Sequence, residues 1–352
     1  MHGRTIKAME QSKVTVIINP VSGISDKHDI PNIINTMLDR RRFVFKTVFT
    51  EYAGHASEIA ANCVTDGQDA VIAVGGDGTI NEVARSIINT DTALGIIPCG
   101  SGNGLARHLM LPLDALGAID VINRYEVHDL DYGIINGHPF FCTCGMGFDA
   151  FISMKFAESG KRGPLTYLQR VLEEGLRYKP ESYEITGDDM EKTYKAFLVT
   201  CANASQYGNN AYIAPHASMS DGLLDVIIME PFDILDAPQV GIDMLNKTLD
   251  KNTKIKTFQA KHIHIKRQKE GYIHFDGDPM MSDKDVDIRV VSKGIKMIVN
   301  PDADKSKRKP NMVQAAFSDF FNDLGSIKDD ITRQRRRLQA LNRLLLSRLN
   351  LY

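Results

Sequence analysis

The sequence lacks the features that define several protein classes. Its cysteines number only five, and their scattered positions, 63, 99, 142, 144 and 201, match neither a disulfide framework nor a zinc site. No apolar run approaches the roughly 20 residues of a membrane span, and residues 1–13 lack the apolar stretch of a signal peptide. These absences predict a cytoplasmic protein, whose contact with the inner face of a membrane would be peripheral.

The sequence also has almost no excess of charge of one sign. The chain has 42 Lys and Arg against 44 Asp and Glu, and a formal net charge of -2 gives no overall attraction to nucleic acid. We therefore expect no nucleic-acid partner. Apolar residues make up 43% of the 352 residues, as in ordinary folded proteins, and this length suits two domains rather than one core.

The first part of the chain alternates between strand and helix patterns. Apolar runs at 14–18, 43–49, 70–74 and 94–97 predict strands, and the segments 31–40, 56–64 and 80–88 predict helices. This alternation indicates an α/β domain with a mostly parallel sheet, over residues 13–131. Ligands of such sheets bind beyond the carboxyl ends of the strands.

The second part, residues 132–294, has a different pattern. Short strand-like runs fall at 140–144, 183–186, 196–202, 224–229, 262–265 and 287–291, with helical segments at 167–178 and 234–249. We expect a β-rich, mainly antiparallel domain. The fold class is therefore α/β with two domains.

Residues 302–352 read as a polar linker followed by a basic amphipathic helix. Apolar residues from Ile327 to Leu349 recur at helical spacing, and arginines between 333 and 348 add positive charge. Such a helix is suited to an anionic membrane surface. Packing within the protein or formation of a homodimer is the other interpretation.

A glycine-rich loop follows the predicted strand at 70–74. In the segment VIAVGGDGTINEVA, residues 71–84, glycines allow backbone N–H groups to approach an anion, and the helix that follows adds its positive end. Asp77 is suited to hold a magnesium ion or accept a proton, and Thr79 and Asn81 are hydrogen-bond donors. A tight turn with capping side chains is the structural alternative.

A second such loop, PCGSGNGLARHL at 98–109, follows the predicted strand at 94–97. The segment Asn19-Pro20 with Ser22-Gly23 follows the first strand. Because carboxyl ends of parallel strands share one sheet edge, the three loops should surround one phosphate-bearing ligand.

These motifs resemble those of the diacylglycerol kinase catalytic-domain family, which includes bacterial diacylglycerol kinases and eukaryotic sphingosine and ceramide kinases. The resemblance covers about residues 13–300, through NPVSG at 19–23, GGDGTINEV at 75–83, PCGSGNGLA at 98–106, GFDA at 147–150, APHASMSDGLLDV at 214–226 and FDGDP at 275–279. It implies an ATP-binding α/β domain similar to NAD kinase and phosphofructokinase, and a sandwich-like domain with the lipid site. A strand near 295–300 would return to the first domain.

The resemblance also implies a set of site residues. The ATP site would comprise Asn19, Thr50, Gly75, Gly76, Asp77, Gly78, Thr79, Ile80, Asn81 and Ser101. Asp221, with backbone carbonyls near Ser218 and Leu223, matches a structural magnesium site, although DGLLD could equally be a hairpin turn. Asp149 matches a position that recognises the lipid head group, and a helix-capping aspartate is the alternative.

The FDGDP segment contains the candidate proton acceptor of the reaction. The family's usual pattern is DGE, with the glutamate as proton acceptor, so the resemblance makes Asp278 the candidate base and Asp276 a candidate Mg²⁺ ligand. This chain has Asp in place of Glu, which moves the carboxylate by one methylene; either the backbone compensates or the base lies elsewhere. Asp77 is the competing base, and a β-turn with two solvated aspartates is the structural alternative.

The predicted function is magnesium-dependent transfer of the ATP γ-phosphate to a hydroxyl of diacylglycerol or a sphingoid-type lipid. An NAD kinase-like enzyme is one alternative, since NAD kinase shares the GGDGT loop. A nucleotide-binding regulator without activity is the other, because of the Asp-for-Glu departure at 278.

Overall fold

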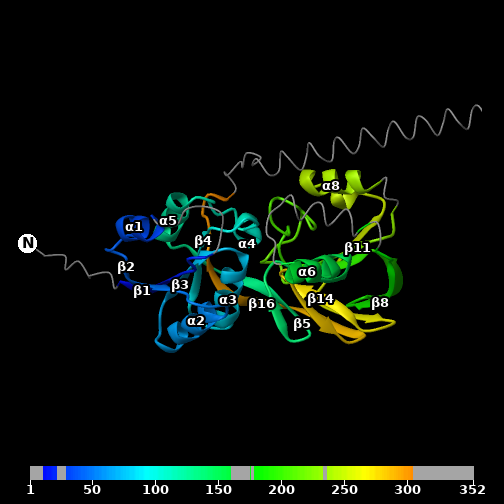
Figure 1. Cartoon of the computed structure of the whole chain (residues 1–352), viewed down its shortest axis with the longest axis horizontal. Helices are drawn as coiled ribbons and strands as arrows, with labels where there is room; N and C mark the ends of the chain where they lie inside the picture. The colour runs from blue at the N-terminus through cyan, green and yellow to red at the C-terminus, as the bar shows by residue number, and fades with distance from the viewer. Residues whose placement is uncertain (1–10, 22–28, 160–174, 176–177, 233–235, 304–352) are drawn as a thin grey trace, which may run out of the picture.

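The computed structural model describes residues 11–21, 29–159, 175, 178–232 and 236–303 (Figure 1). Most of the helix predicted at 167–178 and almost all of the 302–352 tail lie outside these residues, as do Ser22 and Gly23. Within the described residues, no helix is long and apolar enough to cross a membrane.

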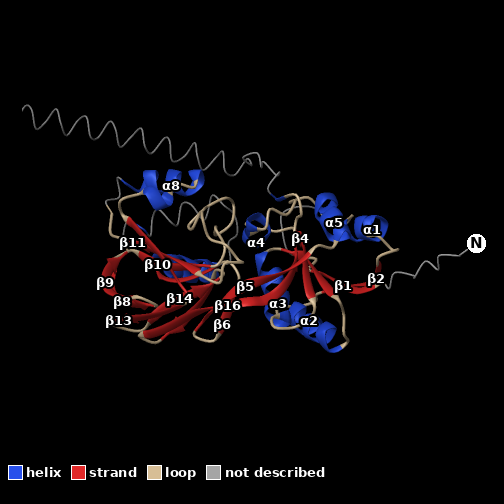
Figure 2. Ribbon diagram, turned by 180° about the vertical axis from the view of Figure 1, so that it is seen from behind, coloured by secondary structure: helices blue, strands red, loops and turns tan. Residues whose placement is uncertain are grey.

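The first half of the chain is built on four parallel strands in the order β2-β1-β3-β4. They are β1 (Ser12–Ile18), β2 (Phe43–Phe49), β3 (Ala70–Gly75) and β4 (Ala93–Pro98). Helices α1 (Ile30–Met37) and α5 (Ala115–Arg124) cover one face, and α2 (His55–Thr65) and α3 (Asp77–Ile87) the other (Figures 1 and 2). All residues of β3 and β4 are buried, because helices cover both faces of the sheet.

The second half contains a separate antiparallel sheet of six strands, in the order β12-β11-β10-β7-β14-β15. These are β7 (Thr143–Gly147), β10 (Leu198–Ala202), β11 (Leu224–Met229), β12 (Ile255–Ala260), β14 (Gly271–Phe275) and β15 (Asp278–Ser282). Helix α6 (Phe148–Ser159) packs on β14 and β15, and α8 (Ala237–Asn246) packs on the short helix η2 (Leu249–Lys251) beside β12.

One long strand, β16 (Asp285–Ile298), belongs to both halves. It pairs with β4 in parallel, Met297 opposite Leu94, and with β5 (Val127–Ile135) and β13 (His262–Arg267) in antiparallel fashion. Through β13 the sheet continues to β8 (Glu181–Gly187) and β9 (Met190–Ala196), while β6 (His138–Phe140) pairs with β5. The first sheet therefore has ten strands and extends through the whole molecule.

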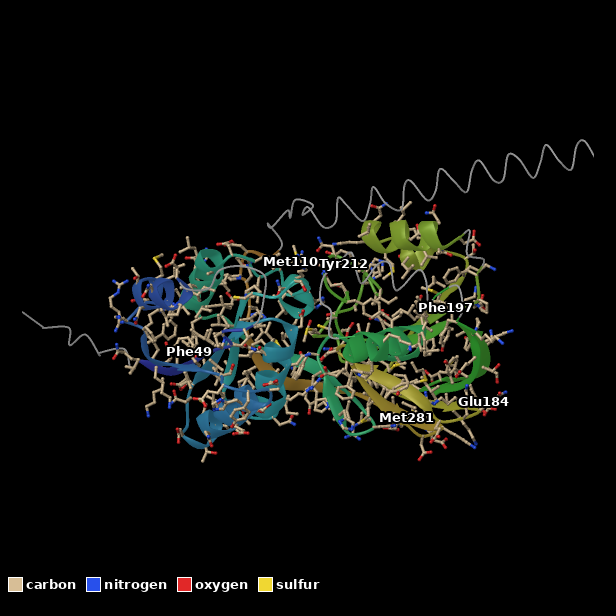
Figure 3. The ribbon with its side chains drawn as sticks, in the orientation of Figure 1. Phe49, Met110, Glu184, Phe197, Tyr212 and Met281 are labelled. Carbon is tan, nitrogen blue, oxygen red and sulfur yellow. The ribbon has the colours of Figure 1, made fainter. Side chains whose placement is uncertain are left out.

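A hydrophobic layer joins this extended sheet to the six-stranded sheet. It contains Cys144, Val199 and Ile273 from the six-stranded sheet, and Ile185 and Ile263 from the ten-stranded sheet. Figure 3 shows the side chains of both halves, with Phe49 in the first half and Met281 in the second. The predicted fold class, an α/β domain joined to a β-rich sandwich, is confirmed.

Several elements differ from the sequence prediction. The strand expected at 140–144 is divided, because β6 ends at Phe140 and β7 begins at Thr143. The backbone N–H groups of Phe141, Cys142 and Thr143 donate to the Asp276 carboxylate, which draws the connection out of strand geometry. Pattern reasoning also placed no helix at α5 or α6.

The pairing of β5 with β6 depends on a glycine at position 133, which lies opposite Phe140. A Cβ at Gly133 would lie 2.0 Å from Cζ of this fully buried ring. We expect Gly133→Ala to lower the free energy of unfolding by about 1–3 kcal/mol, measured by urea denaturation. Phe140→Leu in the same chain should recover part of that loss; equal stability of Gly133→Ala and wild type would contradict this packing.

Candidate active site

The carboxyl ends of β1, β3 and β4 bring the predicted loops together at one sheet edge. The N–H of Asn19 donates to the Val74 carbonyl at 3.1 Å, and that of Cys99 donates to the Gly75 carbonyl at 2.7 Å. Asn19 Nδ2 also donates to Thr79 Oγ1 at 2.9 Å. These bonds tie the first loop to α3 and the second glycine loop to the end of β3.

The two glycine loops touch through their backbones. A Cβ on Gly100 would lie 2.7 Å from the Cα of Gly76, and a Cβ on Gly102 would lie 2.8 Å from Asp77 Oδ2. A Cβ at Gly100 would therefore displace the Gly76 backbone, and a Cβ at Gly102 would displace the Asp77 carboxylate. The glycines of the second loop are therefore required for its position against the first.

Asp77 joins the two loops directly. Its Oδ2 accepts the N–H of Asn103 at 2.8 Å, and its Oδ1 accepts the N–H of Gly104 at 2.7 Å. Burial raises the pKa of Asp77, and these two N–H groups oppose that rise. Because each oxygen already has a donor, the carboxylate is held in a fixed orientation.

Asp77 also begins α3, with Gly76 as its N-cap. The N-terminus of this 11-residue helix, flanked by two glycine loops, is suited to bind a phosphate group. Thr50 and Asn81 are buried beside this edge, and Ser101 is exposed in the second loop. Ile80 lies in the hydrophobic core and its N–H donates to the Gly76 carbonyl, so its part in ligand binding stays a prediction.

Residues 203–211 of the second half pack against the second glycine loop. The N–H of Asn209 donates to the Gly102 carbonyl at 3.1 Å, and Arg107 Nη1 donates to Asn210 Oδ1 at 3.2 Å. The N–H of Ser205 donates to His108 Nδ1 at 3.1 Å. Sequence reasoning missed this contact; the cluster of amides at 203, 206, 209 and 210, three of them buried, was the available signal.

The FDGDP segment forms the hairpin between β14 and β15. Asp276 and Gly277 have φ values of 53° and 88°, as both central residues of a type I′ turn require. Asp276 is partly buried, and its carboxylate accepts the N–H groups of Phe141, Cys142 and Thr143 at 2.7–3.1 Å. Burial raises the pKa of Asp276 against the effect of these bonds.

Asp278 is placed differently from Asp276. Its side chain is 57% exposed, and its Oδ2 lies 3.0 Å from Nη1 of Arg85 on α3. The turn is thus real, yet only one of its two aspartates is solvated. Burial raises the pKa of the Cys142 thiol, and the charges of Asp276 and Asp77 add to this rise, so both carboxylates act on the same thiol.

Asp149 lies in the first turn of α6, with 10% of its side chain exposed. Its Oδ2 accepts hydrogen bonds from the hydroxyls of Thr200 at 2.7 Å and Tyr207 at 3.3 Å, and lies 3.0 Å from His274 Nε2. His274 is 2% exposed. A buried polar cluster therefore surrounds the residue predicted to recognise the lipid head group.

The predicted structural magnesium site is a turn in this structure. Asp221 Oδ1 accepts the N–H of Leu223 at 3.1 Å, and Ser218 Oγ accepts the N–H of Ser220 at 3.3 Å. No group of three or more His, Cys, Asp or Glu side chains suited to a metal occurs among the described residues. A site made of one carboxylate and backbone carbonyls is not such a group, so it stays a prediction.

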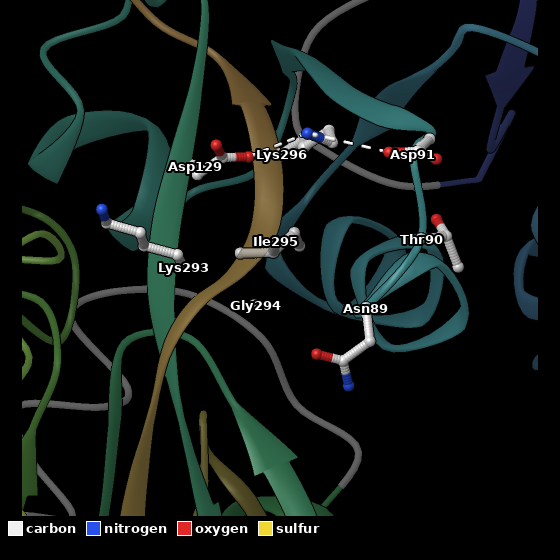
Figure 4. Close-up of a pocket in the computed structure, with 8 residues that line it drawn as sticks. All are labelled: Asn89, Thr90, Asp91, Asp129, Lys293, Gly294, Ile295 and Lys296. Carbon is white, nitrogen blue, oxygen red and sulfur yellow. Dashed lines mark hydrogen bonds and ion pairs between the residues drawn. The ribbon is translucent and has the colours of Figure 1, made fainter.

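A pocket lies at the opposite end of α3 (Figure 4). Lys296 Nζ pairs there with Asp129 Oδ1 at 3.0 Å and with Asp91 Oδ1 at 3.8 Å. None of the residues that line the pocket comes from the glycine loops. They are Asn89 to Asp91, Asp129 and Lys293 to Lys296. This pocket is therefore distinct from the edge where the predicted motifs meet.

The fold and this edge define a class of protein, with a β-sandwich half and an α/β half whose glycine loops are suited to bind phosphate groups. Comparison with known proteins agrees. Residues 13–135 match the diacylglycerol kinase catalytic domain, and residues 143–299 match the YegS C-terminal NAD kinase beta sandwich-like domain. The chain therefore belongs to the diacylglycerol kinase catalytic-domain family, a family of lipid kinases.

Similar proteins include diacylglycerol kinases of two bacteria. The chain is 28% identical to that of Staphylococcus saprophyticus over 273 residues and 28% identical to that of Bacillus subtilis over 275 residues. In both cases the alignment covers 76% of this chain and 89% of the relative. A solved structure of a diacylglycerol kinase from Bacillus anthracis, at 24% identity, has a TM-score of 0.66 over 83% of this chain and 98% of that chain, which shows the shared fold.

The bonds to Asp77 should contribute measurably to stability. Asp77→Ala leaves the N–H groups of Asn103 and Gly104 without their acceptor, so we expect the free energy of unfolding to fall by about 2 kcal/mol in urea denaturation. The matched control is Asp91→Ala, which removes an exposed carboxylate and should change stability by less than about 0.5 kcal/mol. An unchanged stability of Asp77→Ala would show that the loops do not depend on this carboxylate.

The contact between His108 and residues 203–211 should make stability depend on pH. Burial lowers the pKa of His108 from 6.5 to about 4, so between these values the unfolded chain binds a proton that the folded chain does not. Stability should therefore fall as pH drops from 6.5 to 4, by at most about 1.4 kcal/mol per pH unit from this residue. Denaturation of wild type and His108→Gln at pH 7, 6 and 5 measures the difference; identical slopes would contradict the assignment.

Proposed function

We propose that this chain is an ATP-dependent lipid kinase that transfers the γ-phosphate to a hydroxyl of diacylglycerol or a sphingoid-type lipid. One observation carries the proposal. Helix α3 contacts both parts of the site: its first turn carries Asp77, whose carboxylate joins the two glycine loops, and its Arg85 pairs with Asp278 on a hairpin of the other half. A phosphate cradle and an acceptor-side carboxylate are the two parts that phosphoryl transfer needs.

The nucleotide would lie along the carboxyl edge of β1, β3 and β4. The N-terminus of α3 and the N–H groups of the glycine loops would contact its phosphates. Asn19, Thr50, Thr79 and Ser101 stand at this edge with hydroxyl and amide groups suited to phosphate or sugar oxygens. A bound Mg²⁺ would neutralise charge on the transferred phosphoryl group, and Asp276, whose oxygens have lone pairs beyond those used by the backbone, is compatible with a ligand role.

Asp278 is our proposed base. Asp77 and Asp276 accept N–H groups on both carboxylate oxygens, which fixes them in the fold. Asp278 has one oxygen paired with Arg85 and is more than half exposed, so it can reach an acceptor. It would take the proton of the lipid hydroxyl as that oxygen bonds to the γ-phosphorus and the bond to ADP breaks.

The acceptor would be recognised in the second half. The polar cluster of Asp149, Thr200, Tyr207 and His274 is bordered by aromatic rings, with Phe148 4.5 Å from Phe197 and 5.5 Å from Tyr178 between ring centroids. A polar group beside an apolar one suits a lipid with a hydroxyl-bearing head and an acyl chain. We also propose the Asp221 turn as a structural Mg²⁺ site, through Asp221 and the carbonyls near Ser218 and Leu223.

Contact with the membrane would be peripheral, through the basic tail between 302 and 352, of which the structure describes only the first two residues. Its charge and apolar spacing favour anionic bilayers. A homodimer formed through this tail is the other proposal. Deletion of the tail should then change activity on anionic vesicles more than activity on micelles.

Activity on a panel of acceptors tests the proposal. Purified protein with ATP, Mg²⁺ and micelles of diacylglycerol, sphingosine or ceramide should yield a phosphorylated lipid, whereas NAD should not be phosphorylated. Asp278→Ala and Asp77→Ala should each lower kcat about 100-fold or more. Asp283→Ala, an exposed aspartate just after β15, is the matched control and should keep full activity.

Two results would contradict the proposal. Absence of any phospholipid product would remove the kinase assignment, and phosphorylation of NAD would favour the NAD kinase-like alternative. Wild-type rates for Asp278→Ala would show that the base lies elsewhere. Binding of ATP without turnover on any acceptor would favour a nucleotide-binding regulator.

A further inference from the structure

Arg85 connects the nucleotide half of the molecule to the hairpin that carries Asp278. It lies on α3, eight residues after Asp77 and therefore about 12 Å further along the helix axis. Its Nη1 is 3.0 Å from Asp278 Oδ2, and its guanidinium carbon is 5.0 Å from the centre of the Phe275 ring. The ring of His138 stacks on Phe275 at 4.9 Å. The two partners of Arg85, Phe275 and Asp278, are thus paired with each other across the Asp276-Gly277 turn.

The Arg85 guanidinium has few partners apart from Asp278. Its Nε and Nη2 atoms are buried, and neither has a hydrogen-bond partner in the part of the chain that the structure describes. Three quarters of the side chain is covered. Buried N–H groups of a cation that lack hydrogen-bond partners are unfavourable for folding. Among the described residues its ion pair is with Asp278, and its charge also lowers the pKa of Asp276 against the effect of burial.

Asp278 needs such a partner more than a glutamate would. Its side chain is one methylene shorter than that of the glutamate in the DGE pattern, and 57% of it is exposed. An exposed carboxylate without a fixed partner moves between rotamers, and a misplacement of roughly 1 Å can lower a rate on the order of a hundredfold. Arg85 stands on a helix packed against β6, so its guanidinium is held from a rigid element.

We infer that Arg85 is a positioning residue, which holds the short carboxylate of Asp278 in the orientation for proton transfer. The inference rests on the proposed function, in which Asp278 is the base. It links α3, whose first turn supplies Asp77, to the acceptor side of the reaction. The same helix would therefore orient both the phosphate cradle and the base.

A double-mutant cycle in kcat tests the inference on the full-length protein. Arg85→Ala should lower kcat about ten- to a hundredfold, with KM for ATP changed less than about twofold, because Arg85 is remote from the first turn of α3. Arg85→Lys keeps the charge without the planar fork and should recover part of the rate. The longer glutamate of Asp278→Glu needs no such support. In that background, Arg85→Ala should therefore lower kcat by less than about threefold.

The matched control is Lys46→Ala, which removes an exposed ion pair with Asp66 at 4.0 Å, far from the hairpin. It should leave kcat unchanged. Thermal unfolding of each variant separates a folding defect from a loss of rate. Equal losses from Arg85→Ala in both backgrounds, or no loss in the Asp278 background, would overturn the positioning role while leaving the kinase assignment intact. A wild-type protein without phospholipid product would overturn both.

Discussion

The hydrogen bonds from Asn103 and Gly104 to the Asp77 carboxylate are the constraint on which the site depends. They fix two loops from neighbouring strands against each other, at a distance where a Cβ on Gly100 or Gly102 would collide with the first loop. The bonds join the first turn of α3 to the second glycine loop, and residues 203–211 in turn contact that loop through Gly102. A carboxylate that looks from its motif like a catalytic group is therefore also the main structural link of the edge.

Three contacts described above join the second half to the first. Strand β16 joins the two halves in one sheet, residues 203–211 contact the second glycine loop, and Arg85 reaches the Asp278 hairpin. None of these contacts is between neighbours in the sequence. Together they set the distance between the phosphate cradle and the acceptor side without any single flexible connection.

Sequence reasoning could place the loops but not the bonds between them. The carboxyl ends of parallel strands share an edge, so Asn19, Gly75 to Thr79 and Ser101 could be assigned to one site from strand order alone. The hydrogen bonds to Asp276 could not be predicted, because its partners at 141–143 are more than 130 positions away and the motif alone suggests a solvated turn. The sequence did not indicate the contact of Arg85 with the hairpin either, since an arginine on a helix next to a core position is usually solvated.

The shared strand has a consequence for synthesis of the protein. The ribosome releases β1 to β4 early, but the outer edge of β4 has its neighbour only after residues 285–298 have been made. Until then, the nascent chain exposes the unpaired backbone groups of an apolar strand, the kind of edge that invites pairing with other chains. A fragment that ends near residue 131 would keep this edge open permanently, so aggregation of such a truncated product follows from the order of the strands.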